Sequence, residues 1–253
     1  VDPSKVSLNI VGVNHLASLE TAFEMIRRSH AAGANYVKFQ TKDPKLSVPE
    51  EQWNDIRDTP FGEMTKLAYR QKMEFTEEQY REIARFCKGV GIKWFSSAWD
   101  LPSLEKLKRL SPEFIKIPSA RLSDDGLLIE ASGLGYPVIL STGMSTIEQV
   151  DHAVELLGRS LYCLMHCNSA YPCDDAEINL RVIQMLKRRY EGKVFSIGFS
   201  SHSPSPFPAI YSILAGAVMV EVHFTLSRAL KNSDSASSLE YPGLELVCRE
   251  AKR

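Results

Sequence analysis

The sequence predicts an α/β protein that folds as a single-domain (β/α)8 TIM barrel. Three observations lead to this fold class. Apolar, strand-like segments alternate strictly with segments of helical periodicity, and such alternation implies a parallel sheet. Eight strand-then-helix units fit into 253 residues, the usual size of such a barrel. No GxGxxG or GxxxxGK[ST] motif follows a strand, which weakens the nucleotide-binding alternatives. We therefore treat residues 1–253 as one barrel domain.

Composition and charge exclude several classes of protein. Hydrophobic residues make up 44% and charged residues 24% of the chain, as in globular proteins. The 30 Lys and Arg and 31 Asp and Glu leave a net charge of -1, so we expect no nucleic-acid partner. No apolar run approaches the roughly 18 residues of a membrane span, so no membrane partner is expected either. Five cysteines without a CxxC pair indicate reduced thiols and a cytoplasmic protein.

The first units are predicted from apolar spacing and from Gly or Pro punctuation. Residues 7–13 form an apolar strand, and Leu19, Ala22 and Ile26 then recur at helical spacing until Gly33. Residues 36–40 are the second strand. The stretch 43–75 is polar and contains three prolines, so we expect an irregular segment there.

The middle and last units follow the same logic. A capping box at 76–79 opens a helix that ends near Gly91. A second capping box is expected at 145–148, with Ser145 as the first residue and Glu148 as the fourth. The remaining strands are predicted at 93–98, 114–118, 137–140, 161–166, 194–199 and 218–224. The remaining helices are predicted at 101–110, from 124, at 179–190, at 208–215 and from 244.

Polar side chains stand at the carboxyl end of every predicted strand, which is where (β/α)8 barrels place their chemistry. Two lysines on strands, with serine hydroxyls nearby, suit the oxygens of phosphate or carboxylate groups. Two histidines at neighbouring strand ends suit a shared metal ion. The strand ends are, in order: Asn14 and His15; Lys38 and Gln40; Ser96 and Ser97; Lys116 and Ser119; Ser141 and Thr142; His166, Asn168 and Ser169; Ser200, Ser201 and His202; Glu221 and His223.

Taken singly, these residues also have structural explanations. A lone lysine such as Lys38 is often an edge or surface residue, and strand alternation alone does not say which face it takes. His166 has about even odds of being a core residue. The hypothesis of a functional site therefore rests on the coincidence of reactive groups across all the strands.

The strand-end motifs resemble those of the sialic acid synthase family, which includes N-acetylneuraminate, legionaminic acid and pseudaminic acid synthases and spore-coat polysaccharide proteins. The resemblance runs from about residue 8 to residue 245. It is carried by five strings in order: KFQ at 38–40, FIKIPS at 114–119, ILSTGMST at 139–146, HCNSAYP at 166–172 and HFTL at 223–226.

The resemblance implies that the chain condenses phosphoenolpyruvate with an open-chain N-acetylated amino sugar, such as N-acetylmannosamine, for surface polysaccharide biosynthesis. It also implies a divalent metal cofactor, Mn²⁺ or Mg²⁺, and a homodimer. His202 and His223 would be the metal ligands. Lys38, Lys116 and Asp234 complete the implied catalytic set. The implied substrate-binding residues are Gln40, Ser97, Ser119, Arg121, Ser141, His166, Asn168, Ser169, Tyr171 and Ser200.

Several positions depart from the family pattern. Ile10, Arg121 and Ser201 stand where the family usually has acidic residues. Arg121 reverses the local charge and suits an acidic or phosphorylated acceptor. The family's small antifreeze-like C-terminal domain is not expected within 1–253.

Two other functions stay open at this point. The loss of three acidic positions is also compatible with a non-catalytic or repurposed barrel that binds an anionic ligand. An aldolase that forms a Schiff base at Lys116 is a third reading. Phosphoenolpyruvate binding without turnover would favour the barrel without catalysis, and a borohydride-trapped pyruvate adduct would favour the aldolase.

Overall fold

The computed structural model describes residues 7–11 (backbone only), 14–230 and 232–252. The strands are β1 (Ser7–Val11), β2 (Tyr36–Thr41), β3 (Ile56–Thr59), β4 (Gly62–Thr65), β5 (Lys93–Ala98), β6 (Ile115–Ile117), β7 (Val138–Ser141), β8 (Leu161–Cys167), β9 (Ser196–Ser201) and β10 (Met219–His223). The α-helices are α1 (Leu19–Ala32), α2 (Lys66–Met73), α3 (Glu77–Val90), α4 (Leu101–Leu110), α5 (Asp125–Gly133), α6 (Ile147–Leu157), α7 (Arg181–Arg189), α8 (Phe207–Leu214) and α9 (Tyr241–Glu250).

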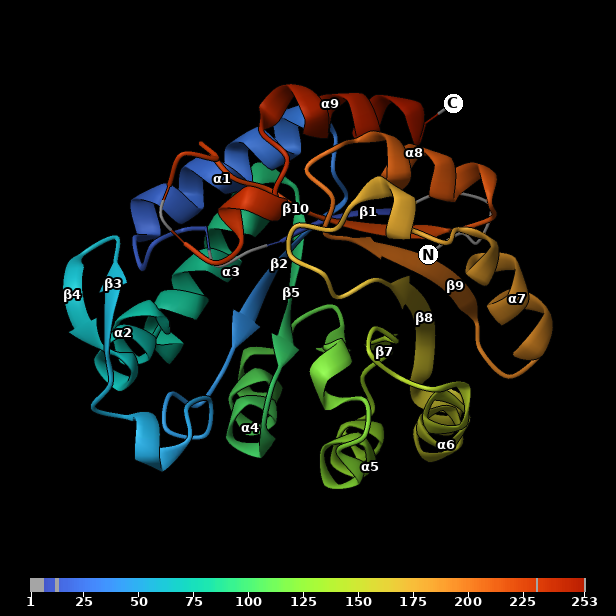
Figure 1. Cartoon of the computed structure of the whole chain (residues 1–253), viewed down its shortest axis with the longest axis horizontal. Helices are drawn as coiled ribbons and strands as arrows, with labels where there is room; N and C mark the ends of the chain where they lie inside the picture. The colour runs from blue at the N-terminus through green and yellow to red at the C-terminus, as the bar shows by residue number, and fades with distance from the viewer. Residues whose placement is uncertain (1–6, 12–13, 231, 253) are drawn as a thin grey trace.

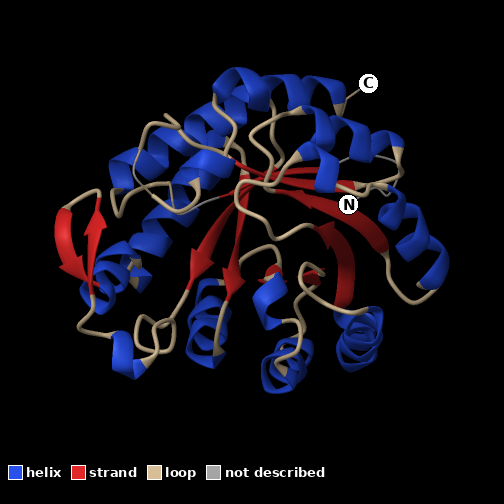
Figure 2. Ribbon diagram, viewed as in Figure 1, coloured by secondary structure: helices blue, strands red, loops and turns tan. Residues whose placement is uncertain are grey.

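The main sheet is parallel throughout and strongly curled. Its strands are hydrogen-bonded in the order β1-β10-β9-β8-β7-β6-β5-β2, and β1 pairs with both β10 and β2, so the ladder closes on itself. The helices lie around the outside of this sheet, as Figures 1 and 2 show. The predicted α/β class and the parallel sheet are confirmed. None of the described helices is long and apolar enough to cross a membrane.

Local signals in the sequence place most helices where they were expected. The capping box of α3 is present, with Thr76 as N-cap and Gln79 reaching back to its backbone N–H. The second predicted box is wrong by one residue, because the N-cap of α6 is Thr146 and its partner is Gln149. A glutamine side chain reaches the N-cap backbone as well as a glutamate does, so the register was ambiguous in the sequence.

The prediction that 43–75 is irregular is wrong. This segment contains the antiparallel hairpin of β3 and β4, followed by α2, whose N-cap is Thr65. The hairpin strands are mostly exposed, so they lack the apolar alternation that marks a core strand. Figure 1 shows the hairpin and α2 standing at one side of the main sheet. For the first strand, only 7–11 of the predicted 7–13 lies within the described residues.

An apolar layer plugs the interior of the curled sheet below the strand ends. It consists of one inward-facing cluster from seven buried positions: Tyr36, Phe95, Phe114, Ile139, Cys163, Met165 and Met219. Gly198 belongs to the same level, because a Cβ there would lie 2.6 Å from the Met219 carbonyl oxygen and 3.0 Å from Cys163 Sγ. Among the described residues, this cluster fills the interior below the strand ends, and the cavity above it opens at the carboxyl ends of the strands.

Candidate active site

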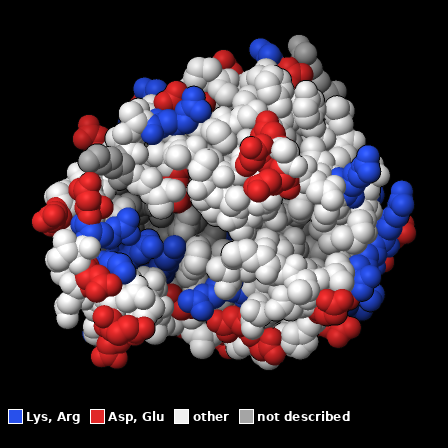
Figure 3. Space-filling view, in the orientation of Figure 1, with Lys and Arg blue, Asp and Glu red and all other residues white. Residues whose placement is uncertain are grey.

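A cavity of about 330 Å³ opens at the carboxyl ends of the strands. Twelve of the fifteen predicted site residues line it: Lys38, Gln40, Ser97, Lys116, Ser119, Ser141, Ser169, Tyr171, Ser200, His202, His223 and Asp234. Figure 3 shows the hollow near the centre of this face, with Lys and Arg side chains gathered beside it.

The alternation of side chains along the strands places the site directly above the apolar plug. Side chains two residues apart point to the same face of a strand. Lys38 therefore follows Tyr36 into the interior, Ser97 follows Phe95, and Glu221 follows Met219. The floor of the cavity is one layer of polar side chains resting on one layer of apolar ones.

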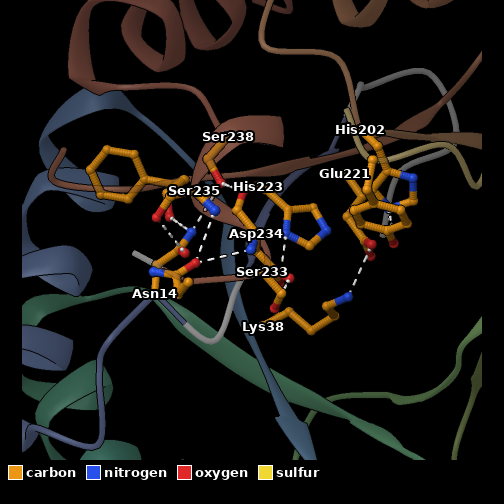
Figure 4. A network of polar contacts seen from close by, with 12 residues as sticks. Asn14, Lys38, His202, Glu221, His223, Ser233, Asp234, Ser235 and Ser238 are labelled. Atoms are coloured by element: carbon orange, nitrogen blue, oxygen red, sulfur yellow. Dashed lines mark hydrogen bonds and ion pairs between the residues drawn. The ribbon is translucent and has the colours of Figure 1, made fainter. Parts of the chain in front are cut away.

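Glu221 joins the two buried lysines of this floor. Its Oε1 accepts a hydrogen bond from Lys38 Nζ at 2.9 Å, and Lys116 Nζ lies 2.5 and 2.6 Å from its two carboxylate oxygens. Ser200 Oγ donates to the same carboxylate at 3.0 Å. Lys38 is on β2 and Glu221 on β10, with β1 between them, whereas Lys116 comes from β6 across the interior. Figure 4 shows Lys38 Nζ directed at the Glu221 carboxylate.

Burial and pairing shift the pKa values of this cluster in opposite directions. Burial alone would raise the pKa of the Glu221 carboxyl, but Lys116 and Lys38 together hold it below its ordinary value. Burial lowers the pKa of Lys38 to about 7, against the opposing attraction of Glu221. Two cations and one carboxylate leave the floor with a net positive charge when all three are ionised. This floor suits an anionic ligand.

Serine hydroxyls surround the lysines. Ser97 Oγ and Ser141 Oγ are buried and have no hydrogen-bond partner among the described residues. Ser119 Oγ accepts from the Gly143 backbone N–H at 3.0 Å. A Cβ at Gly143 would lie 2.2 Å from Ser169 Oγ and 3.0 Å from Ser119 Oγ, so a glycine is needed for this close approach. Unpaired buried hydroxyls are rare, and a phosphate or carboxylate supplies the missing partners.

His202 and His223 lie side by side at the ends of two neighbouring strands, with ring centroids 5.1 Å apart. Nδ1 of His202 lies 2.6 Å from the Asn168 carbonyl oxygen, so this nitrogen carries the proton and Nε2 keeps its lone pair. Nδ1 of His223 lies 3.2 Å from Asp234 Oδ2, at ion-pair distance but without hydrogen-bond geometry. Burial, reinforced by His223, lowers the pKa of His202 to about 3, so its imidazole is neutral.

This donor set fits a divalent metal ion with two protein ligands. Each imidazole has an oxygen next to Nδ1, the arrangement that orients metal-binding histidines through Nε2. Within the described residues, no group of three or more His, Cys, Asp and Glu side chains is placed to hold a metal ion. Water and substrate oxygens would therefore complete the coordination. The Tyr171 hydroxyl lies 2.6 Å from His202 Nε2 and must move aside for a metal ion.

Asp234 reaches the cavity on a loop that Asn14 fastens to the sheet. Asn14 Nδ2 donates to the Phe224 carbonyl oxygen at 2.6 Å and to Ser238 Oγ at 3.0 Å. Ser238 Oγ in turn donates to the Asp234 carbonyl oxygen at 2.6 Å. Burial would raise the pKa of Asp234, but His223 holds it below its ordinary value. Figure 4 shows this network beside His223.

Three predicted substrate-binding residues do not line the main cavity. Arg121 lies in the turn after β6, and its Nη1 is 3.7 Å from Asp124 Oδ2 in the same turn. His166 and Asn168 line a more open neighbouring depression. His166 alternates with Met165 and Cys167, which face the interior, so its side chain takes the other face of β8. Of the substituted family positions, Ser201 does not line the cavity and accepts a hydrogen bond from the Ser203 N–H. The Ile10 side chain lies outside the described residues.

Three charged or aromatic residues that line the cavity are absent from the predicted set. Glu221 was noted at a strand end but not assigned to the site. Lys42 and Trp99 were missed, and Lys42 Nζ lies 3.5 Å from the centre of the Trp99 ring. Period-two alternation would have found both, since Lys42 continues the Lys38–Gln40 series and Trp99 follows Ser97. Both residues lie just beyond the ends of the predicted strands.

The comparisons with known proteins agree with this geometry. The sequence profile of the NeuB family matches residues 25–253. The chain is 36% identical over 235 residues to an N-acetylneuraminate-9-phosphate synthase of Drosophila melanogaster, covering 91% of this chain and 62% of that protein. It is 28% identical over 249 residues to an N,N'-diacetyllegionaminic acid synthase of Campylobacter jejuni, covering 96% of this chain and 74% of that protein.

A solved structure is similar over nearly the whole chain. The N-acetylneuraminic acid synthetase of Leptospira borgpetersenii, crystallised with citrate, has a TM-score of 0.89 and 28% sequence identity. The match covers 99% of this chain and 84% of that one. By contrast, the chain spans just under two-thirds of the length of the Drosophila relative.

Proposed function

The chain belongs to the NeuB family, and from this premise we propose that it condenses phosphoenolpyruvate with the aldehyde form of an N-acetylated amino sugar. The products are a nonulosonate-type 2-keto acid and inorganic phosphate. We also propose that the closed ladder is the complete (β/α)8 synthase barrel. The homodimer remains a prediction from the family resemblance, and the cytoplasmic location remains a prediction from the cysteine content.

The observation that carries this proposal is the floor of the cavity. The floor brings together two buried lysines, two serine hydroxyls without hydrogen-bond partners and the two serine hydroxyls next to Gly143. These groups come from separate parts of the sheet. Phosphoenolpyruvate carries a phosphate and a carboxylate on adjacent atoms, and it needs cations and hydrogen-bond donors in one place. Lys38, Lys116 and Ser200 would bind the anion while Glu221 keeps the two lysines aligned.

The reaction balances without an oxidant or reductant. C3 of phosphoenolpyruvate forms a bond to the aldehyde carbon, whose oxygen takes a proton and becomes a hydroxyl. Positive charge then develops at the enol-phosphate carbon, where water adds and loses a proton. The bond between that carbon and the phosphate oxygen breaks, the departing phosphate takes the proton of the added hydroxyl, and the ketone remains. The apolar plug lies below the cavity, so water would reach this carbon from the mouth.

His202 and His223 would hold the divalent metal ion, Mn²⁺ or Mg²⁺, which supplies Lewis acidity at the aldehyde oxygen when bound. The residues of this chain orient the reactants around that point. Asp234 lies beside His223, and Gln40 and Tyr171 line the acceptor side of the cavity. Together, these contacts would hold the aldehyde carbon near C3 of phosphoenolpyruvate.

The engaged state of Lys116 disfavours the aldolase alternative. Both oxygens of Glu221 lie within 2.6 Å of its Nζ, so this nitrogen is held by a carboxylate rather than directed at a carbonyl carbon. A Schiff-base lysine needs the opposite, a nitrogen that is free to approach the carbonyl carbon.

The test is inorganic phosphate release from phosphoenolpyruvate, with Mn²⁺ or Mg²⁺ and a panel of N-acetylated and phosphorylated aldoses. We expect release only when the metal ion and one acceptor are both present. Binding of phosphoenolpyruvate without release for any acceptor would instead support the barrel that binds an anion without catalysis. Borohydride-dependent attachment of pyruvate to Lys116 would support the aldolase.

A further inference from the structure

Positive charge continues from the floor of the cavity to its rim. A small side recess shares Gln40 and Lys42 with the main cavity and is lined further out by Arg70 and Glu74. Arg70 belongs to α2, and Arg57 of β3 stacks on the neighbouring Tyr69 ring at 4.6 Å. Figure 3 shows this group of Lys and Arg side chains beside the hollow, over the region of β3, β4 and α2 in Figure 1.

The two recess cations have no carboxylate partner. Among the described residues, no carboxylate oxygen lies within the 4.0 Å ion-pair distance of Lys42 or Arg70. Glu74, the acid of the recess, pairs instead with Lys106 at 3.0 Å and accepts the Lys42 backbone N–H at 3.2 Å. Burial raises the pKa of Glu74 to about 7, against the attraction of Lys106. The recess therefore holds a net positive charge.

A second observation points to a ligand at the same place. Trp99 Nε1 is buried and has no acceptor among the described residues. The Lys42 ammonium lies over this ring, and burial, with repulsion from Arg70, lowers its pKa to about 8. A buried hydrogen-bond donor without a partner, next to two cations without a carboxylate partner, suits the binding of an anion.

Strand geometry separates this anion from the donor substrate. Lys38 and Gln40 follow one another along β2 toward the mouth, and Lys42 is the first residue after the end of this strand. At about 3.3 Å per residue, an extended run of four residues puts the Lys42 backbone roughly 13 Å beyond that of Lys38. Gln40, which is predicted to contact the acceptor, lies between them. The far end of the acceptor therefore faces Lys42 when its aldehyde faces the floor.

We propose that the acceptor sugar carries a phosphate ester at the end remote from its aldehyde, and that Lys42 and Arg70 select it. This inference rests on the proposed function, because it takes the acceptor to lie between Gln40 and the rim. It makes Lys42 and Arg70 the residues that distinguish a sugar phosphate from the neutral sugar.

The test uses binding, so that it does not depend on turnover. An N-acetylated hexosamine alditol and its 6-phosphate lack the aldehyde and cannot react. We would measure both by titration calorimetry, with phosphoenolpyruvate present so that the floor is occupied. We expect the phosphorylated alditol to bind about 10- to 100-fold more tightly, as charge-assisted hydrogen bonds to a phosphate allow. In Arg70→Gln and in Lys42→Gln this preference should fall to about threefold or less.

Lys72→Gln is the matched control, because Lys72 is an exposed cation of the same helix whose ammonium lies over Phe61. It should keep the full preference. Equal binding of the two alditols, no binding of either, or a preference that survives in Arg70→Gln would each overturn the inference. Displacement of the sugar phosphate by equimolar inorganic phosphate would also overturn it, since the site would then bind a free anion only.

The failure of the proposed function has a different signature. In that case no aldose releases phosphate from phosphoenolpyruvate, whatever the alditols do. If the enzyme instead turns over the neutral aldose and its 6-phosphate with equal kcat/KM, the synthase activity stands and the rim assignment fails.

Discussion

The floor and the rim of the cavity are both cationic, but their charges are held in different ways. On the floor, Lys38 and Lys116 are buried on strands and share the carboxylate of Glu221. On the rim, Lys42 and Arg70 come from the segment after β2 and from α2, and they have no carboxylate partner among the described residues. The cations of the floor share one carboxylate, whereas those of the rim have none.

This difference teaches what each region does with charge. A buried cation without a partner is costly, so the floor needs Glu221 for the fold to tolerate its lysines at all. The carboxylate also fixes the positions of both ammonium groups before a ligand arrives. The rim is partly hydrated, so it can leave its cations unpaired and use them to attract and select an anion.

The largest expected effect is at the floor. Lys116→Met should lower kcat/KM for phosphate release by at least about 100-fold, because it removes a charge aimed at the ligand. It should also lower the free energy of unfolding by about 3–5 kcal/mol, since Glu221 loses its closer partner in a buried site. Steady-state kinetics and urea unfolding measure the two effects.

The double variant Lys116→Met with Glu221→Gln separates these effects. It should recover most of the stability, because the unpaired carboxylate is gone, but none of the activity. Recovery of activity would mean that Lys116 acts only by compensating the charge of Glu221. The floor would then not use its lysines to bind the ligand, and the proposed difference between floor and rim would be wrong.

The next effect concerns the histidine pair. His223→Ala should weaken Mn²⁺ binding by about 10- to 100-fold and reduce metal-dependent phosphate release to match. His152→Ala is the control, since this exposed histidine of α6 pairs only with Asp125. Unchanged Mn²⁺ affinity in His223→Ala, measured by titration with electron paramagnetic resonance, would remove the metal role of this pair.

A smaller effect is expected in the apolar layer that supports the floor. Gly198→Ala should cost about 1–3 kcal/mol of unfolding free energy, because the new methyl group would meet the Met219 carbonyl oxygen at 2.6 Å. Gly89→Ala, on α3 with no atom within 4 Å of the new Cβ, should stabilise by up to about 1 kcal/mol. Thermal or urea unfolding of both variants decides whether the plug tolerates an added atom.

The smallest expected effect is proton uptake when phosphoenolpyruvate binds. Burial lowers the pKa of Lys38 to about 7, so this lysine is charged below pH 7 and loses its charge as the pH rises through 7. Phosphoenolpyruvate favours the charged form, so its binding at pH 8 should take up a fraction of a proton per site. Calorimetry in two buffers of different ionisation enthalpy measures this uptake. Lys38→Gln should abolish it, and Lys72→Gln, at an exposed lysine outside the cavity, should keep it; equal uptake in both variants would assign the proton elsewhere.

The sequence by itself determined the alternation of strands and helices and the positions where polar groups gather. Both follow from local rules. Apolar residues recur at a short, fixed spacing within each strand and helix. A helix N-cap such as Thr76 is recognisable from the residues next to it in the sequence. The period of two also put Lys38 and Ser97 above an apolar layer, so twelve of the fifteen predicted residues line one cavity.

Only the tertiary structure decided how those groups pair. The contact of Glu221 with Lys116 joins residues 105 positions apart, across the interior, and no local pattern encodes it. Arg121 has the residue type expected of a ligand-binding group, yet it lies next to Asp124 in its own turn. The hairpin of β3 and β4 escaped prediction because its side chains are largely exposed. Spacing along the chain fixes which face a side chain takes, whereas its partner depends on which strands the closed sheet brings together.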